Sequence, residues 1–451
     1  MYPMTWGEGD VWKLSLDSVP REYFYAVTEG GIITRTEWEK HLLSKRSGKK
    51  EIVDKWIDCP IPGCPFPRKH SAAIFDVPGY RGSGTAIPVF SLRGKDGFGV
   101  GEFNDLPTFV DWMKKTGQTV LQLLPVNDTS RLGEWGDSYP YSPVSAFALH
   151  PLFIHLQDVG VKPDKRFREL QKKLNSEPFV DYPEVMRLKS GYLLEAFAQN
   201  GEKDMAKETF KKFEKDNAEW LGPYARLMAE RSGNDASFFR WVQYHLDRQL
   251  KKAVAYAHKK GVYLKGDLPI GVGRDSVDAH SFPKLFNLDS SAGAPPDFFS
   301  AEGQNWGFPT YNWEEMAKDG YAWWKRRLRK MAEYFDAFRI DHILGFFRIW
   351  EIPLGQKGGR LGHFNPAIPY VRGEIEAAGL PIEGLFVEDP HHEGMYHPVI
   401  SPDTSALADW QKERFSAIWN DFFFHRHNEF WKRNALTKLP HLLSATGMLA
   451  C

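Results

Sequence analysis

Short apolar runs and helical stretches alternate along most of this sequence, and the alternation limits the folds open to it. Residues 85–92 form an apolar run, apolar residues recur at helical spacing over 102–116, and the strand-like QTVLQLLPV follows. Helical patterns over 237–260 and 320–335 then precede VYLKGDLPI and FDAFRIDHI. Strands separated by helices form parallel sheets. We therefore predict an α/β fold: a partial (β/α)8 barrel of the TIM type, with about four or five of its strands.

Polar side chains stand where three of these predicted strands end. Asn127 and Asp128 follow the second run, and Asp267 and Asp341 end the next two strands. In barrels of this type the ligand site lies at the carboxyl ends of the strands. We therefore expect these side chains to share one site.

The rest of the sequence divides around this core. Residues 1–45 carry the strand-like segments VWKLSL and EYFYAV, which are too short to bury a core of their own. Residues 46–84 include the proline-rich CPIPGCPFPRK, which is typical of a linker. Charged sequences over about 155–235 interrupt the alternation and predict a helical insertion. We predict a β fragment at 1–45, a linker at 46–84 and the barrel at 85–451.

Charge and cysteine content argue against several classes of function. The 58 basic residues balance 58 acidic ones, so nothing favours nucleic acid or an anionic membrane surface as a partner. Cys59, Cys64 and Cys451 are too scattered for a disulfide framework or a zinc site. The sequence contains neither a signal-peptide pattern nor a long uncharged apolar run. We expect a soluble cytoplasmic protein without a bound metal or cofactor.

Aromatic residues make up 14% of the chain and include 16 tryptophans. Rings of this kind stack on flat amphipathic ligands, and sugars are such ligands. A large aromatic core explains the same composition equally well. Composition alone leaves both interpretations open.

The stretch FRIDHILGFFRIWEIP places one carboxylate, Asp341, between two potential cations, Arg339 and His342. Neighbouring positive charge favours the ionised form of a carboxylate, and an oriented ionised carboxylate can act as a nucleophile. A structural salt bridge at a strand end has the same sequence pattern. For Asp267, a ligand contact and hydrogen bonds from backbone donors at the strand end are both open.

Four stretches carry the polar and aromatic residues of a ligand site: WGDSYPYSPVSAFALHP, KGDLPIGVGRDSVDAHS, GAPPDFFSAEGQNWGFPTYNW and FRIDHILGFFRIWEIP. The last three, in this order, resemble the signature of the 4-α-glucanotransferases, the amylomaltase or disproportionating-enzyme family, glycoside hydrolase family 77. The resemblance extends over about residues 86–451. The forms DSYPYS, FALHPL and FFFHRHNEFW are similar to the branch that carries N-terminal starch-binding modules, and residues 1–45 resemble the end of such a β-sandwich module.

The resemblance implies transfer of α-1,4-glucosyl or glucan units by a retaining double displacement. The implied donors and acceptors are maltose, malto-oligosaccharides and glycogen or a starch-like glucan. Asp341 would be the nucleophile, Arg339 would orient it, and His342 would bind sugar hydroxyls at the cleaved position. The other residues implied to bind substrate are Tyr141, Asp267, Asp297, Phe298, Phe299, Gln304 and Trp306. Phe308 replaces the Asn of the commoner family form, which favours the maltose-using branch.

The same resemblance places the acid/base in a Glu of a G-E-D-L-G motif, after the strand that follows the nucleophile strand. The expected strand here is GMLAC, where the sequence ends, so we expect this chain to lack the acid/base and to be inactive alone. Glu388 in FVEDPHHEG imitates the motif, but we expect it to precede a long helix rather than follow a strand. A non-catalytic glucan-binding protein and an α-amylase-type hydrolase are the alternative functions.

Overall fold

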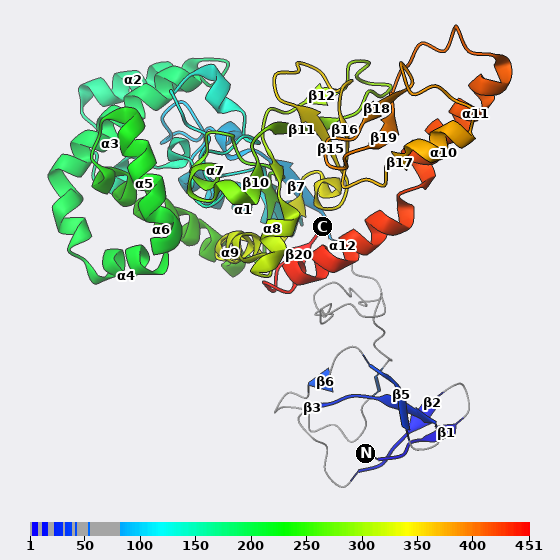
Figure 1. Cartoon of the computed structure of the whole chain (residues 1–451). Coiled ribbons are helices and arrows are strands. Elements are labelled where there is room, and N and C mark those ends of the chain that lie inside the picture. Colours follow the sequence, from blue (N-terminus) through cyan, green and yellow to red (C-terminus); the bar gives the residue numbers. More distant parts are fainter. Residues whose placement is uncertain are drawn as a thin grey trace. The chain divides into compact units, whose positions relative to one another are not determined.

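The computed structural model describes residues 2–7, 11–16, 22–29, 32–37, 41–42, 53–54 and 82–451. The chain divides into two compact units, Met1–Lys69 and His70–Cys451 (Figure 1). Most of the predicted linker over 46–84, with Cys59 and Cys64, lies outside the described residues. Among the described helices, none has both the length and the apolar character needed to cross a membrane.

The first unit consists of short antiparallel strand pairs. The pairs are β1 (Thr5–Gly7) with β2 (Val11–Lys13), β3 (Glu22–Tyr23) with β6 (His41–Leu42), and β4 (Ala26–Glu29) with β5 (Ile32–Thr36). Trp6 and Trp12 stand opposite each other on β1 and β2, and both side chains are exposed. β1 and β2 have three residues each and form a two-stranded pair, which is too small to bury such rings by itself.

A five-stranded parallel sheet forms the centre of the second unit, as the alternation predicts. Its order is β20-β14-β9-β8-β7, and each neighbouring pair is parallel. The strands are β7 (Gly84–Ile87), β8 (Val120–Leu123), β9 (Tyr263–Leu268), β14 (Ala337–Ile340) and β20 (Leu449–Ala450). The first strand is shorter than the apolar run over 85–92, because Pro88 cannot donate to the ladder and a 3-10 turn, Val89–Ser91, follows it.

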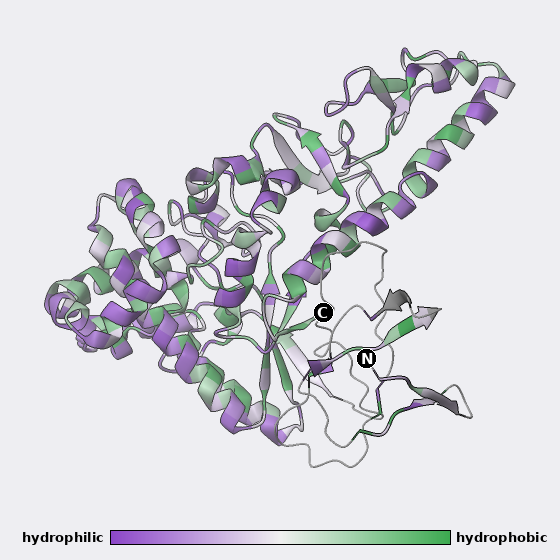
Figure 2. Ribbon diagram, turned by 60° about the horizontal axis from the view of Figure 1, so that its bottom comes forward, coloured by the Kyte–Doolittle hydropathy of each residue, from purple (hydrophilic) through white to green (hydrophobic). Residues whose placement is uncertain are grey.

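A helix precedes each of the later strands and supplies the crossover connection. These helices are α1 (Leu106–Lys115), α6 (Ala236–Lys259), α9 (Ala322–Met331) and α12 (Asn428–Leu443). Asp235 begins α6 by accepting a hydrogen bond from the Ser237 amide, which satisfies one of the free N–H groups at the helix start. The helices alternate apolar and polar residues around their circumference (Figure 2). Their apolar stripes join the strands in one core that includes Leu121, Leu264 and Phe338.

Four helices form the predicted insertion between β8 and α6 (Figure 1). They are α2 (Lys165–Ser176), α3 (Tyr182–Met205), α4 (Glu208–Asp216) and α5 (Ala218–Ser232). Their charged faces carry exposed pairs such as Lys211–Glu208, which contribute little to stability. The inner face contacts the barrel: the Tyr224 hydroxyl donates to Asp128 at 2.7 Å. Asp128 therefore fastens the insertion.

The sequence analysis did not predict the antiparallel sheets of the second unit. One has the order β12-β11-β15-β16 and the other β17-β19-β18 (Figure 1). The strands are β11 (Ser290–Ala294), β12 (Gln304–Asn305), β15 (Ile349–Pro353), β16 (His363–Asn365), β17 (Tyr370–Val371), β18 (Phe386–Glu388) and β19 (Met395–Pro398), and a separate pair joins β10 (Phe286–Asn287) to β13 (Thr310–Tyr311). The remaining helices are α7 (Val277–Ser281), α8 (Trp313–Lys318), α10 (Arg372–Ala377) and α11 (Asp409–Asn420).

A second core lies between these sheets and the start of α12. Its aromatic members include Trp350, Phe364, Phe422 and Trp431. His427 is 1% exposed in this core, and its ring stacks on Trp431 with the centroids 4.6 Å apart. Burial lowers the pKa of His427 to about 4.

We expect the protein to lose stability as the pH falls from about 6.5 to about 4, because the unfolded chain then binds a proton at His427 that the folded chain excludes. This one histidine accounts for about 3 kcal/mol at the acid end of that range. His427→Phe keeps a ring against Trp431 but cannot titrate. As the pH is lowered, its melting temperature should therefore fall less steeply than that of the wild type. Replacing the exposed His425 with Gln is the matched control and should leave the slope unchanged. Equal slopes for His427→Phe and the wild type would contradict the prediction.

Candidate active site

Arg339 on β14 joins two carboxylates at the carboxyl end of the parallel sheet. Its Nη1 lies 2.8 Å from each Asp267 carboxylate oxygen, and its Nη2 donates to Asp341 Oδ1 at 2.7 Å. Arg339 and Asp267 are register partners on the neighbouring strands β14 and β9. The Asp341 amide extends this ladder by donating to the Leu268 carbonyl at 3.1 Å. Strand register therefore places the three charged groups side by side.

Asp267 is the buried carboxylate of this group and holds Arg339 in place. Its side chain is 1% exposed, and it also accepts a hydrogen bond from the Tyr141 hydroxyl at 2.9 Å. Burial raises the Asp267 pKa, while the hydrogen bonds from Arg339 and Tyr141 oppose that rise. These hydrogen bonds come from side chains, so the alternative in which Asp267 serves backbone donors at the strand end is wrong.

Asp341 is the accessible carboxylate of the pair. Its side chain is 27% exposed. Within residues 82–451, Arg339 is its only side-chain partner, and it occupies only Oδ1. A charge-assisted hydrogen bond of this kind fixes the direction of a carboxylate. Asp341 Oδ2 can therefore meet a ligand while Oδ1 stays fixed.

His342 follows Asp341 in a left-handed backbone conformation, with φ 45°. A non-glycine residue holds this conformation only where its surroundings enforce it. Burial lowers the His342 pKa, and the nearby Asp341 charge opposes that effect. Of the two potential cations beside Asp341, Arg339 is the one that donates a hydrogen bond to its carboxylate.

Trp306 lies beside His342 and presents an aromatic surface there. The two ring centroids are 4.7 Å apart in an edge-to-face arrangement. Phe308, which is buried, stacks on the Trp306 ring at 5.8 Å, and Gln304 accepts a hydrogen bond from Trp306 Nε1 at 3.0 Å. Gln304 and Phe308 therefore hold the orientation of the indole.

Asp297, Phe298 and Phe299 occupy a separate, exposed loop. Phe298 is 96% exposed and Phe299 90% exposed, with their centroids 5.6 Å apart. Asp297 Oδ1 accepts the Phe299 and Ser300 amides, which makes it a turn-forming residue. In the described part of the chain, no hydrogen bond, ion pair or ring contact links these three residues to Arg339, Asp341 or His342. Their role in substrate binding stays a prediction.

Tyr139 lies in the first of the four ligand-site stretches, although the residues implied to bind substrate include only its neighbour Tyr141. Its ring lies 5.7 Å from that of Tyr141, and it is 61% exposed. Burial of part of the ring raises the Tyr139 pKa, and the negative charge of Asp341 adds to the effect. The pair of tyrosines around Pro140 in DSYPYS is the sequence signal that identifies it.

Glu388 is not placed as predicted. It ends strand β18, so the expectation that no strand precedes it is wrong. Its Oε1 accepts the Gly394 amide at 2.8 Å, within the turn that joins β18 to β19. Glu388 therefore belongs to the small three-stranded sheet, while Asp341 follows a strand of the parallel sheet.

Comparisons with known proteins agree on one family. The sequence profile of glycoside hydrolase family 77, described as 4-alpha-glucanotransferase, matches residues 87–236 and 228–448. The 4-alpha-glucanotransferase DPE2 of Oryza sativa subsp. japonica is 36% identical over 82% of this chain and 52% of its own length. The 4-alpha-glucanotransferase of Chlamydia pneumoniae is 35% identical over 63% of this chain and 59% of its own length. The chain therefore spans somewhat more than half the length of these curated relatives.

Solved structures lead to the same group. An amylomaltase from Streptococcus agalactiae, solved in complex with acarbose, is 27% identical and superimposes with a TM-score of 0.56 over 64% of each chain. The amylomaltase of Corynebacterium glutamicum is 25% identical, with a TM-score of 0.56 over 62% of this chain and 43% of its own. The parallel sheet, its crossover helices and these matches together confirm the α/β fold of the TIM type. The chain belongs to the 4-alpha-glucanotransferase family, glycoside hydrolase family 77.

Proposed function

We propose that this chain carries the nucleophile of a retaining 4-α-glucanotransferase, and that the nucleophile is Asp341. The observation that supports the proposal is that one arginine, Arg339, binds two carboxylates that differ in their exposure to solvent. Asp267 is buried and anchors Arg339, while Asp341 is accessible and is oriented by Arg339. A carboxylate that is fixed at one oxygen and open at the other suits covalent catalysis on a sugar.

In the proposed reaction, Asp341 Oδ2 bonds to the anomeric carbon of the donor while the glycosidic bond breaks. The leaving sugar oxygen takes a proton from an acid, and a glucosyl ester of Asp341 remains. The 4-hydroxyl of an acceptor glucan then attacks the same carbon, passes its proton to the conjugate base of that acid and displaces the Asp341 carboxylate. Two inversions retain the α configuration. We assign the acid role to neither Asp267, which is committed to Arg339 and Tyr141, nor Glu388, whose Oε1 is committed to its turn.

The proposed substrates are maltose, malto-oligosaccharides and glycogen or a starch-like glucan. Tyr139, Tyr141 and Trp306 offer aromatic and hydroxyl groups next to Asp341 and His342, and stacking on such rings suits the apolar faces of glucose units. The three cysteines in 451 residues suit a reducing compartment, which supports a cytoplasmic setting. On the first unit, the opposed and exposed Trp6 and Trp12 support a proposed role in starch binding.

The test is covalent labelling with 5-fluoro-α-glucosyl fluoride. Fluoride leaves without a proton, so ester formation depends on the nucleophile and not on the acid. We expect the intact mass to increase by one fluoroglucosyl group, carried by the peptide that contains Asp341. Labelling should disappear in Asp341→Asn and in wild-type protein preincubated with excess maltose.

A label on Asp267, or no label at all, would contradict the assignment of Asp341. The accompanying activity test uses maltose as donor and glycogen as acceptor, with free glucose and the lengthened glucan as products. If glucose formed at the same rate when glycogen was omitted, and no longer oligosaccharides were produced, the acceptor would be water. The reaction would then be hydrolysis and not glucosyl transfer.

A further inference from the structure

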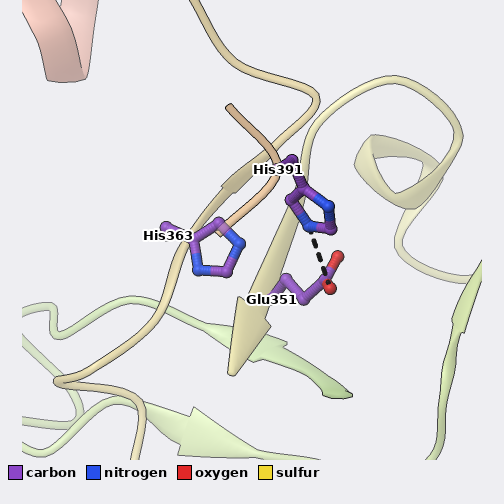
Figure 3. Close-up of side chains that lie close together, drawn as sticks. All are labelled: Glu351, His363 and His391. Atoms are coloured by element: carbon purple, nitrogen blue, oxygen red, sulfur yellow. Dashed lines mark ion pairs between the residues drawn. The ribbon is translucent and has the colours of Figure 1, made fainter. Parts of the chain in front are cut away.

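Glu351, His363 and His391 converge outside the group formed by Arg339, Asp267 and Asp341 (Figure 3). Glu351 on β15 and His363 on β16 are register partners in the four-stranded sheet, and His391 comes from the loop between β18 and β19. One potential ligand atom from each residue lies within 4.8 Å of the others. Two imidazole nitrogens and one carboxylate oxygen are a ligand set that zinc uses in proteins.

The distances are close to those of a zinc site. Zinc bonds of about 2.0–2.1 Å at tetrahedral angles hold two ligand atoms about 3.3 Å apart. Glu351 Oε1 and His391 Nε2 are 3.3 Å apart. With all separations within 4.8 Å, His363 has to approach by no more than about 1.5 Å to complete this geometry.

His363 points to a ligand because one of its nitrogens is left without a partner. The residue is 5% exposed, and in the described part of the chain its buried Nε2 has no hydrogen-bond partner. Buried polar atoms are normally satisfied, so an exception needs a reason such as an ion.

Glu351 is held in the form that a metal requires. Its Oε2 accepts hydrogen bonds from Asn365 Nδ2 and from Thr310 Oγ1, which leaves Oε1 turned toward His391. Outer hydrogen bonds that orient a ligating carboxylate in this way are a regular feature of metal sites.

We propose that Glu351, His363 and His391 bind one Zn²⁺ ion, with water in the fourth position. The ion fastens the β18–β19 loop to the four-stranded sheet, and within that loop the Asp389 carboxylate accepts a hydrogen bond from the His391 amide at 3.0 Å. Glu351 is the register partner of Ala292, whose carbonyl accepts the Trp306 amide at 3.0 Å, so the ion also stabilises the sheet that carries Trp306. This site departs from the expectation of a protein without metal, because its ligands lie on two strands and a loop that no short motif connects.

The test is zinc titration of the untagged full chain after dialysis against EDTA. The cysteines are first blocked with iodoacetamide, so that Cys59, Cys64 and Cys451 cannot bind the metal. Calorimetry with ZnCl2 should give one ion per chain and a higher melting temperature. His391→Gln and His363→Gln should each weaken zinc binding at least about 100-fold. His392→Gln is the matched control, because the neighbouring His392 hydrogen-bonds Asp389 instead and is not a proposed ligand.

His391 is exposed, so His391→Gln is expected to fold normally, and circular dichroism without zinc checks this. Cobalt provides a second readout: the wild type and His392→Gln should develop the visible absorption of a tetrahedral Co²⁺ site, and His391→Gln should not. Zinc binding that is absent from the wild type, or equally strong in all variants, would overturn the proposal.

Discussion

Replacing Asp341 with Asn is expected to reduce glucosyl transfer by a factor of about 10⁴ or more, by analogy with the loss of other catalytic nucleophiles. The amide has the size of the carboxylate and keeps an oxygen that accepts from Arg339 Nη2. It cannot form the glucosyl ester, so the loss is chemical and not structural. The measurement is the rate of glucose release from maltose with glycogen as acceptor. The rate of Asp341→Asn is compared with that of the unsubstituted protein.

Asp336→Asn is the matched control. Asp336 lies at the other end of β14, where its Oδ2 accepts the Leu264 amide at 2.9 Å and contacts His258 at 2.8 Å. The same chemical change there should leave transfer within a factor of about two, because the active ends of parallel strands are at the opposite edge of the sheet. If Asp341→Asn kept a tenth of the activity, Asp341 could not be the nucleophile.

The parallel sheet was predictable because its strands are short apolar runs that alternate with helical patterns along the chain. The carboxyl ends of β9 and β14 identified Asp267 and Asp341 for the same reason, since a parallel sheet brings these ends to one edge. The third predicted strand end did not join them: Asp128 turned toward the insertion and Tyr224. A strand end shows where a carboxylate starts, but not which way its side chain points.

Other features depended on contacts between distant residues. The antiparallel strands have two to five residues, too few for a clear alternation of apolar and polar positions. The Arg339–Asp267 pair joins residues 72 positions apart, and only the register of β9 against β14 creates it. The burial of His342, which lowers its pKa, is not revealed by its neighbours in the sequence. Nothing in the fold or in the relatives supports the expectation that this chain is inactive alone.

The substitution Arg339→Leu distinguishes the effect of Arg339 on Asp267 from its effect on Asp341. The substitution leaves Asp267 buried without its cation, which is expected to cost about 3–5 kcal/mol of folding stability at neutral pH. Burial already raises the Asp267 pKa, and loss of Arg339 removes the main opposing interaction, so the Asp267 pKa should rise further in the folded variant. A group whose folded pKa is raised makes the protein more stable as the pH falls. The loss in melting temperature, relative to the wild type, should therefore be smaller at pH 5 than at pH 8.

Adding Asp267→Asn to Arg339→Leu then separates stability from chemistry. The double variant no longer buries an unpaired charge, so most of the stability should return, and the additional pH dependence of Arg339→Leu should disappear because residue 267 no longer titrates. Transfer should stay at least about 100-fold below the wild type, because Asp341 remains without the guanidinium that orients it. Recovery of activity together with stability would show that Arg339 only supports the fold. Stability without activity would establish that Arg339 positions Asp341 for the reaction.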